Sequence, residues 1–280
     1  MLSQQLTEYL RDPKNYRAGK QAYTGGPATF YVKEFVLYAD PITPPDVQLA
    51  AYPEVEALWL RVKIKLGLLD HGLLRCYANL SHGSSTELGW HRDVRSFEQG
   101  CTTAMFYVSE QGSNTRFTDH ELEFAPGKLV LFDSSRLHTA LPYAGDIPRV
   151  VLVFKSRKQT DDILFMKRYG WHTLAHGKHW KFDEHLRATA FELAGQPDHV
   201  VKAGLYHAAY GTQYFKPLAS PTREQLRAHI GMAAELLVYR FCTEDRCSIV
   251  DPELAAIAAA NAKAINTDYL NNGQDHDTKH

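Results

Sequence analysis

The sequence predicts a two-domain α+β protein with a β-rich first half and a helical second half. Between residues 73 and 155, short β-branched and aromatic segments recur at roughly ten-residue spacing with turn residues between them, which is typical of a sandwich or barrel. From residue 163 onward, apolar residues recur at helical spacing. The polar stretch 156–162 is expected to be a linker. We therefore expect domains at residues 1–157 and 163–270, followed by a disordered polar tail at 271–280.

Composition limits the class of protein. The chain has 280 residues, of which 44% are hydrophobic, so it can bury a sizeable core. Its 31 Lys and Arg residues nearly balance 32 Asp and Glu residues, which argues against nucleic acid or an anionic membrane as the main partner. No apolar run has the length of a signal peptide core or a membrane span. Four scattered cysteines predict neither a disulfide scaffold nor a zinc site, so we expect a reducing, cytoplasmic location.

The first half begins with a short amphipathic helix, expected within residues 1–17 and ended by Pro13. Residues 29–38 are rich in aromatic and β-branched side chains and predict a strand. Residues 52–66 are ambiguous, and we favour a helix that turns into a strand. Further strands are expected at residues 73–79, 102–109, 121–124, 129–133 and 149–155.

The second half predicts helices, because its apolar residues recur every three or four positions. Thr222 and Gln225 have the spacing of a reciprocal helix cap, and Asp251-Pro252 resembles another helix start. The Ala-rich segment 254–264 is expected to be a packing or interface helix. The predicted helices span residues 182–193, 200–210, 222–241 and 252–264.

A candidate metal site comes from GWHRD, which contains His91 and Asp93, and from LFDSSRLH, which ends at His138. Side chains at i and i+2 of an extended segment point to one face, so His91 and Asp93 can bind one ion while Arg92 points away. The third ligand must come from another strand or its end, where His138 lies. Two imidazoles and one carboxylate can hold Fe(II) on one face and leave other positions open. The alternative is two polar loop residues and a capped surface histidine.

Several other features accompany these ligands in order: Tyr77 on the preceding strand, Pro126-Gly127 before a hydrophobic strand, and Arg149 opening the last strand. Together they make residues 70–155, with RCYANL, GWHRD, TTAMFYVS and APGKLVLFDSSRLH, resemble the Fe(II)/2-oxoglutarate-dependent dioxygenase superfamily in its prolyl-hydroxylase-like branch. The resemblance implies a double-stranded β-helix, also called a jelly roll or cupin-like fold. It implies His91, Asp93 and His138 as iron ligands, and Arg149 as the partner of the cosubstrate's C5 carboxylate. Tyr77 is a second cosubstrate candidate or, equally, a core aromatic residue.

The resemblance implies Fe(II), 2-oxoglutarate and O2 as the reaction's requirements. Because Asp93 is a carboxylate, no ligand position is vacant for chloride, which favours hydroxylation over halogenation and leaves desaturation or cyclisation open. We expect a small-molecule substrate, either a free amino acid or an intermediate of specialised metabolism. The alternatives are a hydroxylase of protein side chains and a non-catalytic, cupin-like binding or sensor protein. A substrate carboxylate would meet one of four arginines, unless all are solvated charges: Arg75, Arg92, Arg95 and Arg136.

The helical half contains DEHLRAT, AGLYHAAYGTQYF and ELLVYRFC, which are similar to HD-like metal-binding domains. The resemblance singles out His185 and His207. In a working HD site the second His is followed by an Asp ligand, whereas Ala208 stands here. We therefore expect a degenerate HD-like domain that covers the barrel, contacts the substrate or forms a homodimer, with a bound metal as the less favoured alternative.

Overall fold

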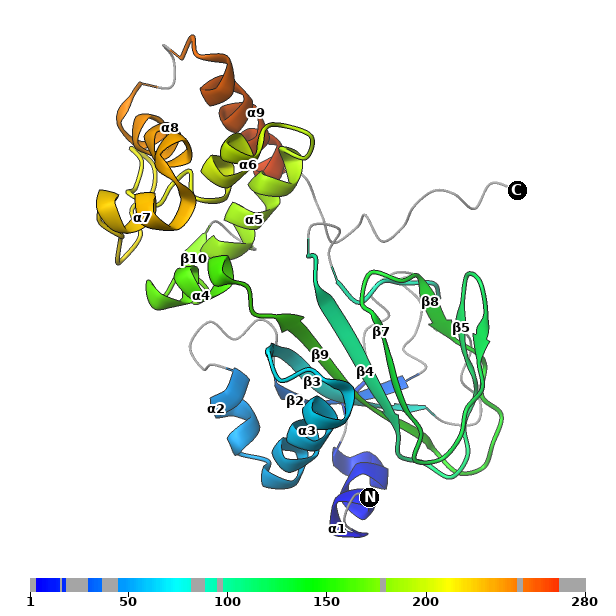
Figure 1. The fold of residues 1–280 in the computed structure, drawn as a ribbon. Helices are drawn as coiled ribbons and strands as arrows, with labels where there is room; N and C mark the ends of the chain where they lie inside the picture. Colours follow the sequence, from blue (N-terminus) through cyan, green and yellow to red (C-terminus); the bar gives the residue numbers. More distant parts are fainter. Residues whose placement is uncertain are drawn as a thin grey trace. The chain divides into compact units, whose positions relative to one another are not determined.

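The computed structural model describes residues 4–15, 17–18, 30–36, 45–81, 89–94, 98–176, 180–245 and 249–266. Contacts within the chain divide it into two compact units, with the boundary between Gln159 and Thr160 (Figure 1). The tail expected at 271–280 lies outside the described residues. None of the helices in the described ranges is long and apolar enough to cross a membrane.

The first unit is a mixed α/β structure with two antiparallel sheets. The larger has the strand order β1-β2-β3-β9-β4-β7, and the smaller has the order β6-β5-β8. Its longest pairing joins β3 to β9, from His71 opposite Lys158 to Ser81 opposite Arg149. The strands are β1 (Arg17–Ala18), β2 (Phe30–Val36), β3 (His71–Ser81), β4 (Cys101–Tyr107), β5 (Thr115–Phe117), β6 (Glu121–Leu122), β7 (Leu129–Asp133), β8 (His138–Ala140) and β9 (Arg149–Lys158).

The larger sheet is buried on both faces, because apolar residues occupy both sets of alternating positions on β9. Leu152 and Phe154 pack against the helices on one face, where Phe154 stacks on Trp59 at 5.3 Å between ring centroids. Val151 and Val153 face the opposite side. The helical layer consists of α1 (Gln4–Arg11), the short 3-10 helix η1 (Pro13–Asn15), α2 (Pro45–Ala50) and α3 (Pro53–Leu66) (Figure 1).

Two predictions for this unit need correction. Residues 53–66 form one continuous helix, with no strand, because Pro53 begins it, Gly67 ends it at φ 69°, and Val55, Trp59 and Val62 form one buried face. The linker expected at 156–162 is much shorter, although the boundary between the two units does fall within this stretch, between Gln159 and Thr160. Strand β9 continues to Lys158, and α4 begins at Asp161 with Thr160 as its cap.

The described part of the second unit is helical and contains one short hairpin. Its core includes Trp171, Phe182 and Tyr206. The helix predicted at 222–241 is interrupted, because Gly231 adopts φ 88° between α7 and α8, whereas the predicted reciprocal cap at Thr222 is present. The elements are α4 (Asp161–Arg168), β10 (Ala175–His176), β11 (Trp180–Lys181), α5 (Phe182–Glu192), α6 (Asp198–Leu205), α7 (Arg223–Ile230), α8 (Met232–Thr243) and α9 (Pro252–Asn266).

A buried carboxylate joins α7 to α8. Glu235 accepts hydrogen bonds from Arg223 at 2.6 Å, Arg227 at 3.1 Å and Tyr210 at 3.0 Å. Burial opposes ionisation of Glu235, but the two guanidinium groups outweigh it and lower its pKa. Because both arginines are partly exposed, we expect Glu235→Gln to lower the free energy of unfolding by about 2 kcal/mol at pH 7, less than for a fully buried pair.

This effect has a defined pH dependence. A carboxyl whose pKa is lower in the folded state stabilises that state above its unfolded pKa, and the stabilisation is lost as the pH falls through the folded pKa. Urea unfolding of wild type and Glu235→Gln should therefore differ at pH 7 and converge in acid. Glu253→Gln, at a surface pair with His199, is the matched control. A pH-independent difference would show that charge is not the cause.

Candidate metal centre

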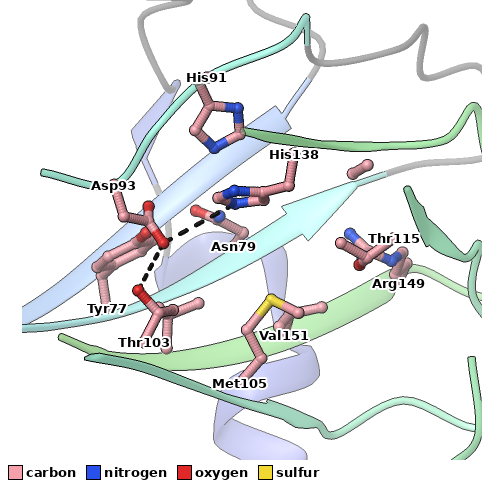
Figure 2. Close-up of a pocket in the computed structure, with 12 residues that line it drawn as sticks. Tyr77, Asn79, His91, Asp93, Thr103, Met105, Thr115, His138, Arg149 and Val151 are labelled. Carbon is pink, nitrogen blue, oxygen red and sulfur yellow. Dashed lines mark hydrogen bonds and ion pairs between the residues drawn. The ribbon is translucent and has the colours of Figure 1, made fainter. Parts of the chain in front are cut away.

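The backbone brings the two predicted histidines together. His91 and His138 form an isolated antiparallel bridge, in which each N–H donates to the other's carbonyl oxygen, at 2.9 and 3.0 Å. Asp93 N–H donates to the Ser134 carbonyl at 2.9 Å, which extends the contact between the two segments. One potential ligand atom each from His91, Asp93 and His138 lies within 4.8 Å of the others. Figure 2 shows the three side chains pointing toward one another.

Both imidazoles are oriented by backbone carbonyls. Nδ1 of His91 lies 3.0 Å from the Gly89 oxygen, and Nδ1 of His138 lies 2.9 Å from the Arg136 oxygen. Because a carbonyl only accepts, each Nδ1 carries a proton, and Nε2 is the ring nitrogen left for a metal. Burial, followed by the neighbouring His138, lowers the pKa of His91 to about 4. His91 is therefore neutral at pH 7, as metal binding requires.

Asp93 is held at both carboxylate oxygens. Oδ2 accepts a hydrogen bond from Thr103 Oγ1 at 2.7 Å, and Oδ1 lies 2.6 Å from Lys155 Nζ. Burial alone would raise the pKa of Asp93, but Lys155 and the two imidazoles hold it well below its usual range. The buried side chain is therefore a carboxylate at neutral pH, available as a metal ligand.

Next to these residues is a cavity of about 40 Å³, enough for a few water molecules. Arg149 lies across the cavity from the metal-ligand candidates in Figure 2. The residues that line the cavity are Tyr77, Asn79, His91, Asp93, Thr103, Met105, Thr115, His138, Ala140, Arg149, Val151 and Val153.

Arg149 is a buried cation in a largely neutral environment. Arg149 is 4% exposed, and its guanidinium lies 5.8 Å from the centre of the Tyr107 ring. Within the described residues, its Nε has no hydrogen-bond partner and no acidic side chain forms an ion pair with it. Burial lowers its pKa, yet a guanidinium keeps its proton at physiological pH. A buried charge of this kind is costly without an anion, so the cavity is suited to an anionic ligand.

Tyr77 lies at a position compatible with either of the two roles considered for it, a core aromatic residue or a cosubstrate contact. It is buried on β3 and also lines the cavity. Its ring lies 4.5 Å from the Arg75 guanidinium and 5.4 Å from Lys155 Nζ, measured to the ring centroid. Burial raises the pKa of its hydroxyl, so Tyr77 is a neutral hydrogen-bonding group at the wall of the cavity.

Three of the four arginines considered for substrate binding lie outside the lining of this cavity. Arg75 pairs with Glu34 at 2.7 Å, Arg92 donates to the Ser135 carbonyl, and Arg136 pairs with Asp119. Arg95 lies outside the described residues. The residues that the sequence did not single out are Thr103 and Lys155. Alternation along β9 gave a signal for Lys155, because positions 149, 151, 153 and 155 of a strand share one face.

The second histidine cluster lies inside the helical unit. His185 Nε2 is 3.3 Å from His207 Nε2 and 2.9 Å from Asn261 Oδ1, and His207 Nδ1 donates to the Gly204 carbonyl at 2.8 Å. These three side chains supply two imidazoles and an amide but no carboxylate, and the buried Ala208 has no ligand atom. Among the residues that the structure describes, His91, Asp93 and His138 form the one group of three His, Cys, Asp or Glu residues with metal-site geometry.

Substituting Thr103 tests whether its hydrogen bond to Asp93 positions that candidate ligand. Its hydroxyl contacts both Asp93 and the buried Ser134 Oγ, the latter at 2.8 Å. We expect Thr103→Val to weaken divalent metal binding by about tenfold, because a valine keeps the shape and removes the contact to the ligand. Thr103→Ser should stay near wild type. The metal dissociation constant measures the effect, and equal affinities for the valine variant and wild type would contradict it.

Among known protein families, a sequence match covers part of the chain. The family model "Domain of unknown function (DUF6817)" matches residues 165–246, in the helical unit. No curated protein sequence matches the chain.

Several solved structures resemble the fold. One is a prolyl 4-hydroxylase of Pseudomonas putida, with 20% identity, TM-score 0.37, and coverage of 57% of this chain and 89% of the other. A 2OG-Fe(II) oxygenase family protein of Burkholderia pseudomallei has 12% identity, TM-score 0.38, and coverage of 47% and 69%. HygX of Streptomyces hygroscopicus, solved with nickel and 2-oxoglutarate bound, has 12% identity, TM-score 0.35, and coverage of 47% and 70%. At these TM-scores the similarities do not assign this chain to a family.

Proposed function

We propose that the first unit is an Fe(II)- and 2-oxoglutarate-dependent hydroxylase with a jelly-roll fold, acting on a small molecule such as a free amino acid or an intermediate of specialised metabolism. One observation carries the proposal. The candidate ligands His91, Asp93 and His138 converge on a cavity that is also lined by Arg149, a buried cation without an acidic partner among the described residues. This combination provides for a metal and an anion in one place.

The donor set fits Fe(II). Two imidazoles and one ionised carboxylate are the ligands of non-haem iron oxygenases, and they leave positions open for other molecules. Bound Fe(II) with 2-oxoglutarate would supply O2-dependent decarboxylation of the cosubstrate coupled to oxidation of a substrate C–H bond. The Nδ1 contacts of the histidines and the Thr103 contact of Asp93 fix the three ligands before a metal arrives.

The remaining wall suits the cosubstrate. The Arg149 guanidinium would bind the C5 carboxylate through paired hydrogen bonds, which its planar fork favours. Tyr77 adds a hydroxyl-bearing ring to the same wall. Met105, Val151 and Val153 add apolar surface to the wall beside Arg149, and a lower local polarity would strengthen the attraction between Arg149 and a bound dianion.

For the second unit we propose a degenerate HD-like helical domain that binds no metal and serves in substrate contact or dimerisation. Among the described residues, no group of three potential ligands with metal-site geometry includes His185 or His207, which supports this proposal. Metal analysis of the full chain should then give about one bound ion per chain. Replacing His91 or His138 should abolish its binding.

The proposed activity is tested by incubating the protein with Fe(II), O2 and 2-oxoglutarate and measuring succinate. We expect slow, substrate-independent formation of succinate that a chelator abolishes. Candidate substrates are then compared for stimulation, with free amino acids in one arm and cell-extract proteins in the other. Stimulation by proteins alone would favour a side-chain hydroxylase, and no succinate in any arm would contradict the proposed activity.

A further inference from the structure

A largely buried lysine lies against the carboxylate that the proposed centre uses. Lys155 Nζ is 2.6 Å from Asp93 Oδ1 and 3.0 Å from the Asp93 carbonyl oxygen. The Lys155 side chain is 11% exposed and that of Asp93 is 4% exposed. One ammonium therefore fixes both the side chain and the backbone of the same residue.

The sheet dictates this placement. On β9, Lys155 lies opposite Arg75 of β3 on one side and opposite Thr103 of β4 on the other. Thr103 of β4 donates a hydrogen bond to the second carboxylate oxygen of Asp93. The adjacent strands β4 and β9 therefore bind one oxygen each. Lys155 is not among the residues that line the cavity, and it contacts the centre through Asp93.

Among the residues that the structure describes, the charges around the cavity do not cancel. Arg75 is balanced by Glu34 at 2.7 Å. Lys155 and Arg149 together carry two positive charges, whereas Asp93 supplies one negative charge to the cavity wall. A divalent ion bound by Asp93 would add to this positive excess, and burial strengthens the resulting repulsion. A dianion bound at Arg149 would relieve it.

We propose that Lys155 is a positioning residue that holds Asp93 as a single-oxygen ligand and sets the charge of the centre. It serves as the counter-ion of Asp93 when no metal is bound, and it makes retention of a divalent metal depend on a dianionic 2-oxo acid. This inference rests on the proposed function. The positive charge of Lys155 repels the metal and attracts the dianion, so Lys155 weakens the binding of metal alone and strengthens the binding of the dianion to the metal-loaded protein. The coupling between metal and dianion is reciprocal.

Lys155→Met tests the proposal, since methionine keeps the length and removes the charge. The probes are Co(II), titrated without 2-oxoglutarate, and then 2-oxoglutarate, titrated into the Co(II)-loaded protein. We expect Co(II) to bind about tenfold tighter to the variant and 2-oxoglutarate about tenfold weaker, because ion repulsion in a buried site exceeds the positioning effect of one hydrogen bond. Lys155→Arg, which keeps the charge, should restore both affinities toward wild type.

The matched control is Lys158→Met, the same substitution on the same strand at a side chain that is 62% exposed. It should change neither affinity. If Lys155 had a merely structural role, the methionine variant would bind both Co(II) and 2-oxoglutarate more weakly. That result, or unchanged affinities, would overturn the proposal.

The outcomes also separate this inference from the proposed function. If wild type binds Co(II) and 2-oxoglutarate but Lys155→Met matches it, the role of Lys155 alone fails. If wild type binds no Co(II), or His91→Ala binds it equally well, the metal centre itself is wrong and both proposals fail.

Discussion

Replacing His91 by Ala should remove 2-oxoglutarate turnover and weaken Fe(II) binding by at least about a hundredfold, because one of three metal ligands is lost. His91 is preferable to Asp93 for this test, since removing Asp93 would leave the buried ammonium of Lys155 without its carboxylate. The measurements are succinate formation and the metal dissociation constant.

The control for this prediction is His199→Ala. His199 lies in the helical unit, where its half-exposed ring pairs with Glu253 at 2.9 Å. It should leave metal affinity and turnover unchanged. Turnover in His91→Ala at the wild-type rate would rule out the proposed ligand set, whatever the state of the fold.

Replacing Arg149 by Met should raise the KM for 2-oxoglutarate by about a hundredfold, the equivalent of losing paired, charge-assisted hydrogen bonds in a buried site. Metal binding in the absence of the cosubstrate should not weaken, because Arg149 is not one of the ligand candidates. Arg149→Lys should be intermediate, since an ammonium keeps the charge and loses the planar fork.

Arg116→Met is the control for Arg149. Its side chain is 46% exposed and pairs with Glu121 on the surface of the smaller sheet. An unchanged KM in Arg149→Met would show that the buried guanidinium does not bind the cosubstrate. A loss of metal affinity equal to the loss of cosubstrate affinity would instead indicate general damage to the site.

How much of the site could be predicted depends on sequence distance. His91 and Asp93 are two residues apart, so local strand geometry was enough to group them. Their union with His138 required the resemblance, because the bridge between the two segments is a long-range pairing that periodicity does not reveal. Lys155 was missed for the same reason. Alternation along β9 places Lys155 on the same face as Arg149, but its contact with Asp93 depends on β9 lying between β3 and β4, and alternation does not predict strand order.

The errors in the fold have local causes. The apolar residues of 52–66 satisfy alternation and helical spacing alike, and the choice is decided by burial against the sheet, where Trp59 stacks on Phe154. The polar stretch 156–162 looked like a linker because Ser156 and Arg157 are hydrophilic. Both are buried, and they continue β9 opposite β4. Pairing with a neighbouring strand thus overrode the composition of this segment.

The central claim is that one cavity binds a ferrous ion and a 2-oxo acid together. Anaerobic titration of Fe(II) in the presence of 2-oxoglutarate tests it most directly, because chelation of the metal by the 2-oxo acid gives a weak visible charge-transfer band. We predict that the band saturates at about one Fe(II) per chain, is absent in His91→Ala, and requires far more 2-oxoglutarate in Arg149→Met. No band in the wild-type protein, or an undiminished band in His91→Ala, would contradict the proposed centre.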